Sequence, residues 1–341
     1  MGGAAWRVKR RTLFGRIAFT TVGAGLGLGN LLGAGEAATP RGSVTAESAP
    51  PARGRWFTRA ALPVARSEVG VATVNGKVYV IGGYANGRVD QPLNEEYDPA
   101  LDRWRERAPL PLGLNHVGVI GLAGKLYALG GFVLQNRSAV ADVSEYDPAT
   151  DKWRALASLP SPRGAAGITV LNGKIHAIGG RDTVSVGTHE VYDPATNRWS
   201  ALAALPQGRD HLGVVTIGGK IYAAGGRFNT FEHNTDLHDM YDPGTNTWVS
   251  RPPMPTARSG IAVAAWNGQL LVFGGERLGG TFTEAEAYDS GTNTWTTLTP
   301  MPSGRHGTGA AAVGNLIYVP AGGPVNGGSQ QSAVNFVFTL S

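Results

Sequence analysis

The sequence has 341 residues, 42% of them hydrophobic, with 50 glycines, 21 prolines and no cysteine. This composition is typical of many short strands joined by tight turns, and it excludes a disulfide framework, a thiolate nucleophile and a Cys-ligated metal. Residues 1–38 hold five of the 30 basic and one of the 25 acidic side chains, so the rest is nearly neutral, which argues against a nucleic-acid partner.

Residues 1–38 form a predicted export signal. Arg10 and Arg11 precede a weakly apolar stretch, residues 17–34, which is followed by small residues. This order of charge and this length are typical of an export signal. The arginine pair, followed by Leu13 and Phe14, resembles a bacterial twin-arginine signal. The resemblance implies a periplasmic or secreted protein that crosses the membrane in the folded state.

Two other functions remain open for this segment, a membrane anchor and a signal for export of an unfolded chain. Residues 17–34 contain five glycines and Asn30, which make a poor membrane-spanning helix. We therefore expect no stable membrane anchor. Residues 39–54 are rich in proline, alanine, serine and glycine without apolar periodicity, so they are predicted to be a flexible linker.

A repeating unit fills residues 55–341 and is clearest in residues 167–205. Asn172 and Gly173 separate two apolar runs, and Asn-Gly in this setting is a strong hairpin signal. An Asp-Pro pair begins a later turn. One copy is a four-stranded antiparallel meander, too small to bury its own faces. The expected strands are residues 167–171, 174–178, 188–192 and 199–205.

The unit recurs six times, at intervals of 46 to 49 residues. Two independent residue types keep this period, which identifies a true repeat. Five copies also carry Tyr-Asp, and Phe336 replaces the tyrosine in the sixth. The Gly-Gly pairs begin at Gly82, Gly130, Gly179, Gly225, Gly274 and Gly322, and the tryptophans are Trp56, Trp104, Trp153, Trp199, Trp248 and Trp295.

This pattern of Gly-Gly, Tyr and Trp resembles the kelch repeat. The resemblance implies an all-β fold, a six-bladed β-propeller over residues 55–341. Trp56 comes before any Gly-Gly pair, and no Trp follows Gly322. We therefore expect the segment around Trp56 to supply the fourth strand of the last blade, which would close the ring and remove its open edge.

One face of such a propeller carries the connections from strand 4 of each blade to strand 1 of the next, together with those from strand 2 to strand 3. The loops on this face differ from blade to blade, so functional residues are expected there. An arginine recurs in the 4-to-1 connection of five blades, and Leu114 replaces it in the second. These arginines are Arg66, Arg163, Arg209, Arg258 and Arg305.

Two roles are open for the arginines. In the first, each binds backbone carbonyls or acidic groups of a blade as a structural part of the repeat. In the second, they form a ring of guanidinium donors that binds a carboxylate or a polar glycan. Kelch adaptors of ubiquitin ligases resemble the second arrangement, since they bind acidic peptides with arginine and serine at such positions. The predicted ligand-binding residues are Arg66, Glu68, His116, Arg163, Arg181, Arg227, Arg258, Arg305 and His306.

Acid–base chemistry is a further hypothesis for the same face. Arg209, Asp210, His211 and Glu276 offer an anion-binding group, an acid and a base in adjoining blades, so they are the predicted catalytic residues. His233 and His238 are expected to lie with acidic neighbours in the 2-to-3 loop of the fourth blade, where they could bind a divalent metal. Their spacing matches no rigid ligand motif, so a solvated loop is preferred to a metal site.

Two kinds of kelch enzyme are relevant to these residues. Galactose oxidase resembles this chain in its propeller, but its copper site requires a cysteine, which the chain lacks. The exported N-acetylneuraminate epimerases are similar in fold and compartment, and they imply a cofactor-free sugar mutarotase or epimerase as an alternative. The main hypothesis is an exported monomer, without metal or cofactor, that binds a polar or anionic ligand: a glycan, a sugar acid or an acidic peptide. A third possibility is a purely structural module that interacts with another protein, which a flat and apolar second face would favour.

Overall fold

Tight turns with left-handed backbone separate the strands, as the Asn-Gly pairs predict. Asn172 and Gly173 have φ of 52° and 72°, and Asn75 and Gly76 have φ of 51° and 71°. Positive φ at both central residues is the requirement of the two-residue hairpin turn that matches strand twist. The computed structural model describes residues 53–340. The predicted signal and most of the predicted linker lie outside the described residues.

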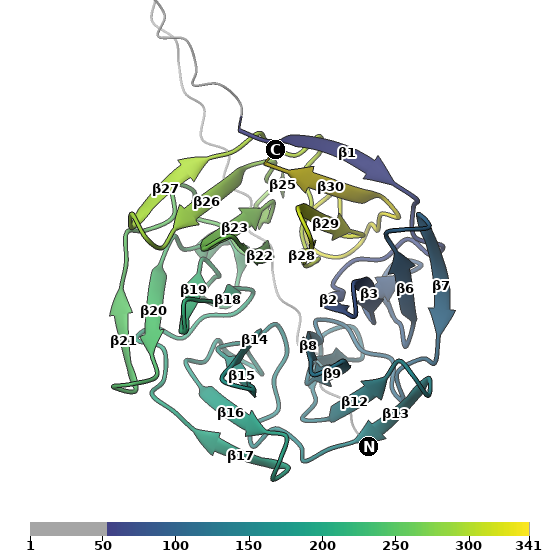
Figure 1. Ribbon diagram of the computed structural model, residues 1–341, viewed down its shortest axis with the longest axis horizontal. Helices are drawn as coiled ribbons and strands as arrows, with labels where there is room; N and C mark the ends of the chain where they lie inside the picture. Colours follow the sequence, from purple (N-terminus) through teal and green to yellow (C-terminus); the bar gives the residue numbers. More distant parts are fainter. Residues whose placement is uncertain (1–52, 341) are drawn as a thin grey trace, which may run out of the picture. The chain divides into compact units, whose positions relative to one another are not determined.

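The strands form six four-stranded antiparallel sheets arranged as the blades of a ring (Figure 1). From the channel outward, the first blade contains β2 (Gly70–Val74), β3 (Lys77–Ile81), β6 (Asn94–Asp98) and β7 (Arg103–Arg107); the second contains β8 (Gly118–Leu122), β9 (Lys125–Leu129), β12 (Val143–Asp147) and β13 (Lys152–Ala155). The third contains β14 (Gly167–Leu171), β15 (Lys174–Ile178), β16 (His189–Asp193) and β17 (Arg198–Ala201); the fourth contains β18 (Gly213–Ile217), β19 (Lys220–Ala224), β20 (His238–Asp242) and β21 (Thr247–Ser250).

The fifth blade contains β22 (Ala262–Trp266), β23 (Gln269–Phe273), β26 (Ala285–Asp289) and β27 (Thr294–Thr297). The sixth contains β28 (Ala311–Val313), β29 (Leu316–Pro320), β30 (Asn335–Thr339) and β1 (Arg55–Arg59). Three ribbons lie in 2-to-3 loops: β4 (Tyr84–Ala85) with β5 (Val89–Asp90), β10 (Phe132–Val133) with β11 (Ser138–Ala139), and β24 (Glu276–Arg277) with β25 (Gly280–Thr281). A 3₁₀ turn, η1 (Phe231–His233), lies in another.

The N-terminal strand closes the ring, which confirms the prediction from Trp56. β1 pairs with β30 over five residue pairs, from Arg55 with Thr339 to Arg59 with Asn335. In Figure 1, β1 and β30 lie side by side although they come from opposite ends of the sequence. Six sheets with this closure make the fold an all-β six-bladed propeller.

The repeated aromatic residues are packing parts. In the first blade the Tyr97 and Trp104 rings lie 5.0 Å apart, and the Trp104 Nε1 donates to the Ala60 carbonyl at 2.7 Å. The Tyr97 hydroxyl bonds the Asp102 carboxylate at 2.6 Å. The next four blades repeat the tyrosine–tryptophan contact at 5.0 to 5.4 Å. The landmarks that reveal the repeat therefore stabilise each blade and its contact with the preceding blade.

Backbone pairing aligns two loops in every blade and positions the candidate site. In five blades the residue after Gly-Gly forms a β-bridge with a residue of the 4-to-1 connection, as Tyr84 does with Ser67 and Arg227 with Asp210, and in the sixth blade Gly323 of the pair itself bridges to His306. Gly83 permits this approach, because a Cβ there would lie 2.4 Å from the Ser67 carbonyl oxygen. Variable side chains from both loops are thereby held at the same end of the channel. Within residues 53–340, no helix is long and apolar enough to cross a membrane.

Candidate functional site

Six equivalent residues surround the channel mouth in left-handed backbone, and we call them the rim positions. In five blades the rim residue donates its N–H to the carbonyl of the rim residue in the preceding blade, at 2.9 to 3.1 Å. In the first blade the donor to the Gly307 carbonyl is Val69, the residue after Glu68. These bonds close a circle through all six blades. The rim residues are Glu68, His116, Ala165, His211, Gly260 and Gly307, with φ between 50° and 64°.

Ionisable side chains from five blades meet at this mouth, and we call them the mouth cluster. The members are Glu68, His116, Asp210, His211, Arg227, Glu276 and His306. Nearly all are buried, with His306 and Asp210 fully inaccessible to solvent. Seven of the predicted site residues are thus brought together, although they lie in separate repeats of the sequence.

Each rim histidine is oriented by the residue before it. The Nδ1 of His211 bonds Oδ1 of Asp210, and the Nδ1 of His116 lies 2.5 Å from Oδ1 of Asn115. The Nε2 of His116 lies 3.0 Å from Oε2 of Glu68, while the two imidazole rings meet edge to face with centroids 4.8 Å apart. The Nε2 atoms of both rings therefore lie toward the channel mouth with Glu68.

Arg227 joins the two sides of the cluster. Its Nε lies 3.1 Å from Oδ1 of Asp210, one terminal nitrogen lies 2.6 Å from Oε1 of Glu276, and the other lies 2.9 Å from Nε2 of His211. All its nitrogens are thus engaged, and the side chain acts as a rigid crosslink between the fourth and fifth blades. An incoming anion would have to compete with two carboxylates for this guanidinium.

His306 completes the cluster from the sixth blade. Its Nδ1 lies 3.2 Å from Oε1 of Glu68 and 3.5 Å from Oε2 of Glu276, and its Nε2 lies 2.7 Å from the Val325 carbonyl oxygen. A buried imidazole between two carboxylates is stabilised in its protonated form.

The pKa values divide the cluster into proton donors and acceptors. Burial by itself lowers the pKa of His306, but Glu68 and Glu276 outweigh it and raise the value to about 9. Burial and Arg227 lower the pKa of His211 to about 4. Burial alone would raise the pKa of the Glu68 carboxyl, yet His116 and His306 hold it well below its usual range. At neutral pH, His306 carries a proton while His211 and Glu68 can accept one.

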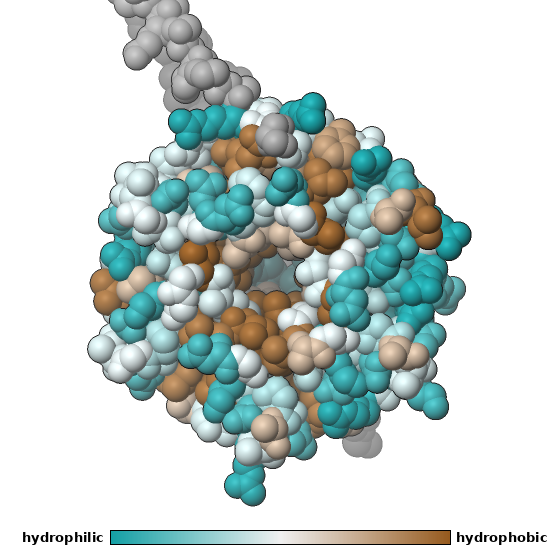
Figure 2. Space-filling view, in the orientation of Figure 1, coloured by the Kyte–Doolittle hydropathy of each residue, from teal (hydrophilic) through white to brown (hydrophobic). Residues whose placement is uncertain are grey.

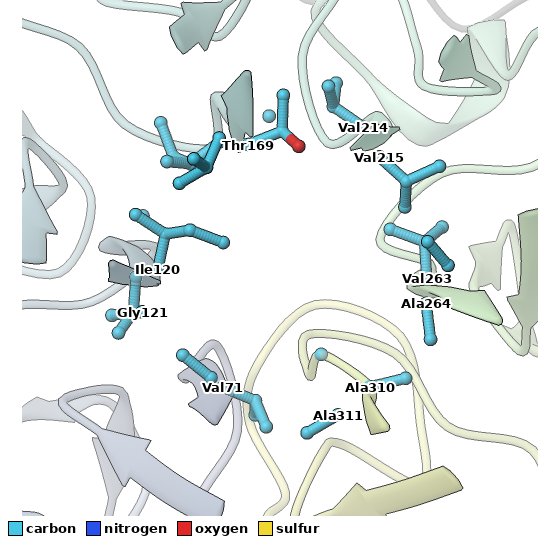
Figure 3. A pocket seen from close by; sticks show the side chains of 18 of the residues that line it. Val71, Ile120, Gly121, Thr169, Val214, Val215, Val263, Ala264, Ala310 and Ala311 are labelled. Carbon is cyan, nitrogen blue, oxygen red and sulfur yellow. The ribbon is translucent and has the colours of Figure 1, made fainter. Parts of the chain in front are cut away.

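A polar pocket of about 280 Å³ opens over the cluster. Glu68, His116, Arg227 and Glu276 form part of its wall, and Tyr84, Arg88, Gln135, Asn136 and Phe231 belong to the loops around it. Beyond the rim positions, the central channel has a volume of about 490 Å³ and is lined mainly by apolar side chains of the innermost strands (Figure 3). Figure 2 shows the central opening with hydrophobic residues around it.

Four of the predicted arginines are buried in their own blades instead. Arg258 donates to the carbonyls of Gly274 at 3.0 Å and Glu284 at 2.6 Å, and it pairs with the Glu286 carboxylate at 2.8 Å. Arg66, Arg163 and Arg209 make the same type of contacts, with carboxylate partners Glu95, Glu190 and Asp239. Because these guanidinium groups lie within a blade, we assign them the structural role and remove them from the site.

The remaining blades support this assignment. Ser144 occupies the position of the carboxylate in the second blade, where Leu114 replaces the arginine. Phe336 occupies it in the sixth, and the Arg305 guanidinium stacks 5.3 Å from the Phe336 ring centroid. The expectation that Phe336 replaces the repeat tyrosine is therefore wrong by two residues, since Phe338 pairs with Trp56 and holds that position. Arginine and carboxylate thus occur together in four blades and are both absent from the second, as expected of a structural pair. The sixth blade keeps the arginine without the carboxylate, and because the Arg305 guanidinium packs on Phe336, Arg305 is also removed from the site.

Arg181 has an intermediate position. Its guanidinium lies 5.1 Å from the Phe132 ring centroid, and burial lowers its pKa while the charge of nearby Asp210 opposes that effect. It therefore lies at the edge of the mouth cluster. Elsewhere, His238 lies buried in β20 with its Nδ1 3.1 Å from the Pro252 carbonyl oxygen, so it packs in the blade and belongs to no loop site.

Several residues of the site were missed from the sequence. Ser185 bonds the Asp210 carboxylate, Asn115 orients His116, and Tyr84 contacts the His116 ring edge to face at 6.0 Å. Arg88 and Phe231 come from irregular 2-to-3 loops, where no repeat pattern marks them. For Tyr84 and Asn115 a signal exists, since Tyr84 directly follows a Gly-Gly pair and Asn115 directly follows Leu114, where the second blade departs from the repeat.

Comparisons with known proteins agree with this architecture. The model of the KLHDC2/KLHL20/DRC7 Kelch-repeats domain matches residues 55–226 and 203–340. Among solved structures, one described as the "Structure of YjhT" aligns with a TM-score of 0.71 and 19% sequence identity, covering 81% of this chain and 95% of that one. No curated protein sequence matches the chain. On the family match and its six closed blades, the chain belongs to the kelch-repeat family.

Proposed function

We propose that the protein is exported and binds a small polyhydroxylated ligand, of the sugar type, at the mouth cluster. The observation that carries the proposal is the convergence of seven ionisable side chains, six of them buried, from five blades beneath one polar pocket. Burying charged groups is costly, and such groups with strongly shifted pKa values are concentrated at functional sites.

The chemistry of the pocket favours a ligand with both hydroxyl donors and acceptors. Glu68 and Glu276 accept hydrogen bonds, Asn136 and Arg88 donate them, and Phe231 offers an apolar face for the carbon skeleton. Because the arginines of the 4-to-1 connections are buried in the blades, a polyanion is not favoured over a neutral sugar. A sugar with a single carboxylate remains compatible with Arg88.

Binding is tested with a panel of neutral sugars and sugar acids in thermal-shift and calorimetric titrations. We expect Glu68→Gln to weaken binding of the responding ligand by roughly tenfold or more, since a hydrogen bond to a charged group contributes about 1.5–3 kcal/mol. The matched control is Glu106→Gln, which changes an exposed carboxylate on β7. Equal affinity in a folded Glu68→Gln protein would remove the mouth cluster as the binding site.

Mutarotation of the bound sugar is a second candidate function. It is favoured by the opposite protonation of His306 and His211 in one cluster. Ring opening needs a base to remove the anomeric hydroxyl proton as the ring C–O bond breaks, and an acid to protonate the ring oxygen. Return of the hydroxyl to the other face of the carbonyl gives the second anomer, so no cofactor is consumed.

Mutarotation predicts a bell-shaped pH profile. We expect anomer exchange, measured by NMR, to decline as the pH falls toward about 4, where His211 gains a proton. It should also decline above about 9, where His306 loses one. N-acetylneuraminate and other sugar acids are suitable first substrates. Exchange no faster than in buffer across this range would exclude mutarotation of the tested sugars while leaving ligand binding intact.

A further inference from the structure

The rim positions place three metal-ligating atoms together. One atom each from Glu68, His116 and His211 lies within 4.8 Å of the other two. We infer that these side chains bind one divalent transition-metal cation at the mouth of the channel. The inference goes beyond the proposed function and does not rest on it, because cation binding is measurable without any sugar.

The ring architecture explains why the three ligands meet. They occupy equivalent left-handed positions in the first, second and fourth blades. The other rim positions are Ala165, Gly260 and Gly307, which add almost no side-chain volume. A Cβ at position 307 would lie 2.5 Å from Cδ of Glu68, so glycine there makes room for the carboxylate. The rim thus combines three donors with open space.

His116 provides the clearest argument for a cation. The Asn115 amide nitrogen donates to Asp90 at 2.7 Å and to the Phe132 carbonyl at 3.0 Å, which fixes its oxygen as the acceptor facing His116 Nδ1. Nδ1 therefore carries the hydrogen, and Nε2 of His116 is the ring atom that faces a Glu68 oxygen 3.0 Å away. This pair of atoms is placed so that one cation could be coordinated by both.

The second histidine has the supporting contact that metal ligands usually have. Nδ1 of His211 bonds the Asp210 carboxylate, which leaves Nε2 as the donor atom. Carboxylate–histidine pairs of this kind orient ligands and raise their basicity in metal sites. Ligands about 2.0–2.1 Å from a tetrahedral zinc lie about 3.3 Å apart. The Glu68 and His116 atoms are close to that spacing, and the His211 atom, which lies within 4.8 Å of both, would have to move nearer to them.

Arg227 competes with the cation. Its terminal nitrogen lies 2.9 Å from Nε2 of His211, where it occupies the lone pair that a metal would use. Its contacts with Asp210 and Glu276 do not need that nitrogen. Metal binding therefore requires Arg227 to release His211 only. Removing this positive charge should strengthen cation binding, a result that a purely structural cluster does not predict.

The donor set selects the class of metal. Two imidazoles and one carboxylate suit Zn²⁺, Fe²⁺ and Co²⁺ and are poorly matched to Mg²⁺ or Ca²⁺, which prefer oxygen ligands. Three protein ligands leave coordination positions free for water or a ligand hydroxyl from the pocket above.

The test uses the chain after EDTA treatment and dialysis, titrated with Zn²⁺ by calorimetry and with Co²⁺ by visible absorption. We expect one equivalent to bind and Co²⁺ to show the intense bands of four- or five-fold coordination. His116→Ala and Glu68→Gln should weaken binding by more than about 100-fold, since even supporting residues cost roughly 10–100-fold. Arg227→Gln should tighten it, and exposed His233→Ala should leave it unchanged.

Two outcomes overturn the inference. In the first, the unaltered chain titrated with Co²⁺ gives only the weak spectrum of the hydrated ion. This result does not depend on the folding of any variant. The other is Zn²⁺ uptake that is equal in His116→Ala and in the unaltered chain. Sugar binding by EDTA-treated protein that takes up no metal would preserve the proposed function and reject the metal site. Metal uptake by a protein that binds none of the sugars would preserve the metal site and reject the proposed function.

Discussion

A chain that lacks residues 1–62 should lose most of its folding stability. The deletion removes β1 and leaves β30 as an open edge at the end of the sixth blade. It also removes Trp56, whose ring lies 4.9 Å from that of Phe338 and 5.2 Å from that of Phe273, and whose Nε1 donates to the Thr299 carbonyl at 2.9 Å. Deleting one buried tryptophan side chain typically costs about 3–5 kcal/mol.

The loss of unfolding free energy on deleting residues 1–62 should therefore exceed the cost of removing Trp56 alone. That cost is already a large share of the roughly 5–15 kcal/mol that stabilises a typical domain. Circular dichroism during urea unfolding measures the effect. A chain that begins at Arg53 serves as the control, because it keeps β1 and should unfold at the same urea concentration as the full chain. The urea midpoint of Trp56→Ala should lie between the midpoints of the chain that begins at Arg53 and the chain that lacks residues 1–62. An unchanged midpoint for the shorter chain would show that β1 does not close the ring.

The propeller was predictable because each blade repeats its packing parts in the sequence. Gly82 and its equivalents permit close approach of two loops, Tyr97 and its equivalents bind a turn residue, and Trp104 and its equivalents bond the adjacent blade. Each role requires a particular residue type, so Gly-Gly and Trp keep their period in six copies and Tyr in five. Ring closure followed from the unmatched Trp56, and the pairing of β1 with β30 confirms it.

The arginines show where a repeat pattern is ambiguous. Recurrence established that Arg163 and its equivalents share a role, but a structural role and a shared binding role recur equally well. The resolving signal was in the next strands, where Glu190 recurs with the arginine and Ser144 accompanies Leu114. Pairing two positions across a blade requires the strand register, which the sequence pattern alone places only within a residue or two.

The convergence of the mouth cluster depends on the geometry of the closed ring. Arg227, Glu276 and His306 lie in different blades, and their contacts at 2.6 and 3.5 Å follow from the angle between sheets. The sequence marked the variable positions after Gly-Gly and at the rim, which was sufficient to name these residues. It could not show that Arg227 crosslinks carboxylates and that Arg258 never reaches the mouth.

Replacing Arg258 by leucine should destabilise the protein by about 3–5 kcal/mol. The variant leaves the Glu286 carboxylate buried without its ion-pair partner, a cost typical of a broken buried pair. It also leaves the carbonyls of Gly274 and Glu284 without the guanidinium donor. Arg258→Leu with Glu286→Ser should recover a substantial part of the loss, because the second blade carries Leu114 and Ser144 at these positions.

The same pair of variants separates structure from binding. Urea unfolding gives the free energies of unfolding, and calorimetry gives the affinity for Zn²⁺ or for a responding sugar. Since Arg258 is confined to the fifth blade, the double variant should keep the affinity of the unaltered chain even though it lacks a guanidinium. A double variant that is stable but has lost binding would return Arg258 to the site and restore the guanidinium ring as the recognition element. Single and double variants of equal stability would instead show that the buried pair does not act as a unit.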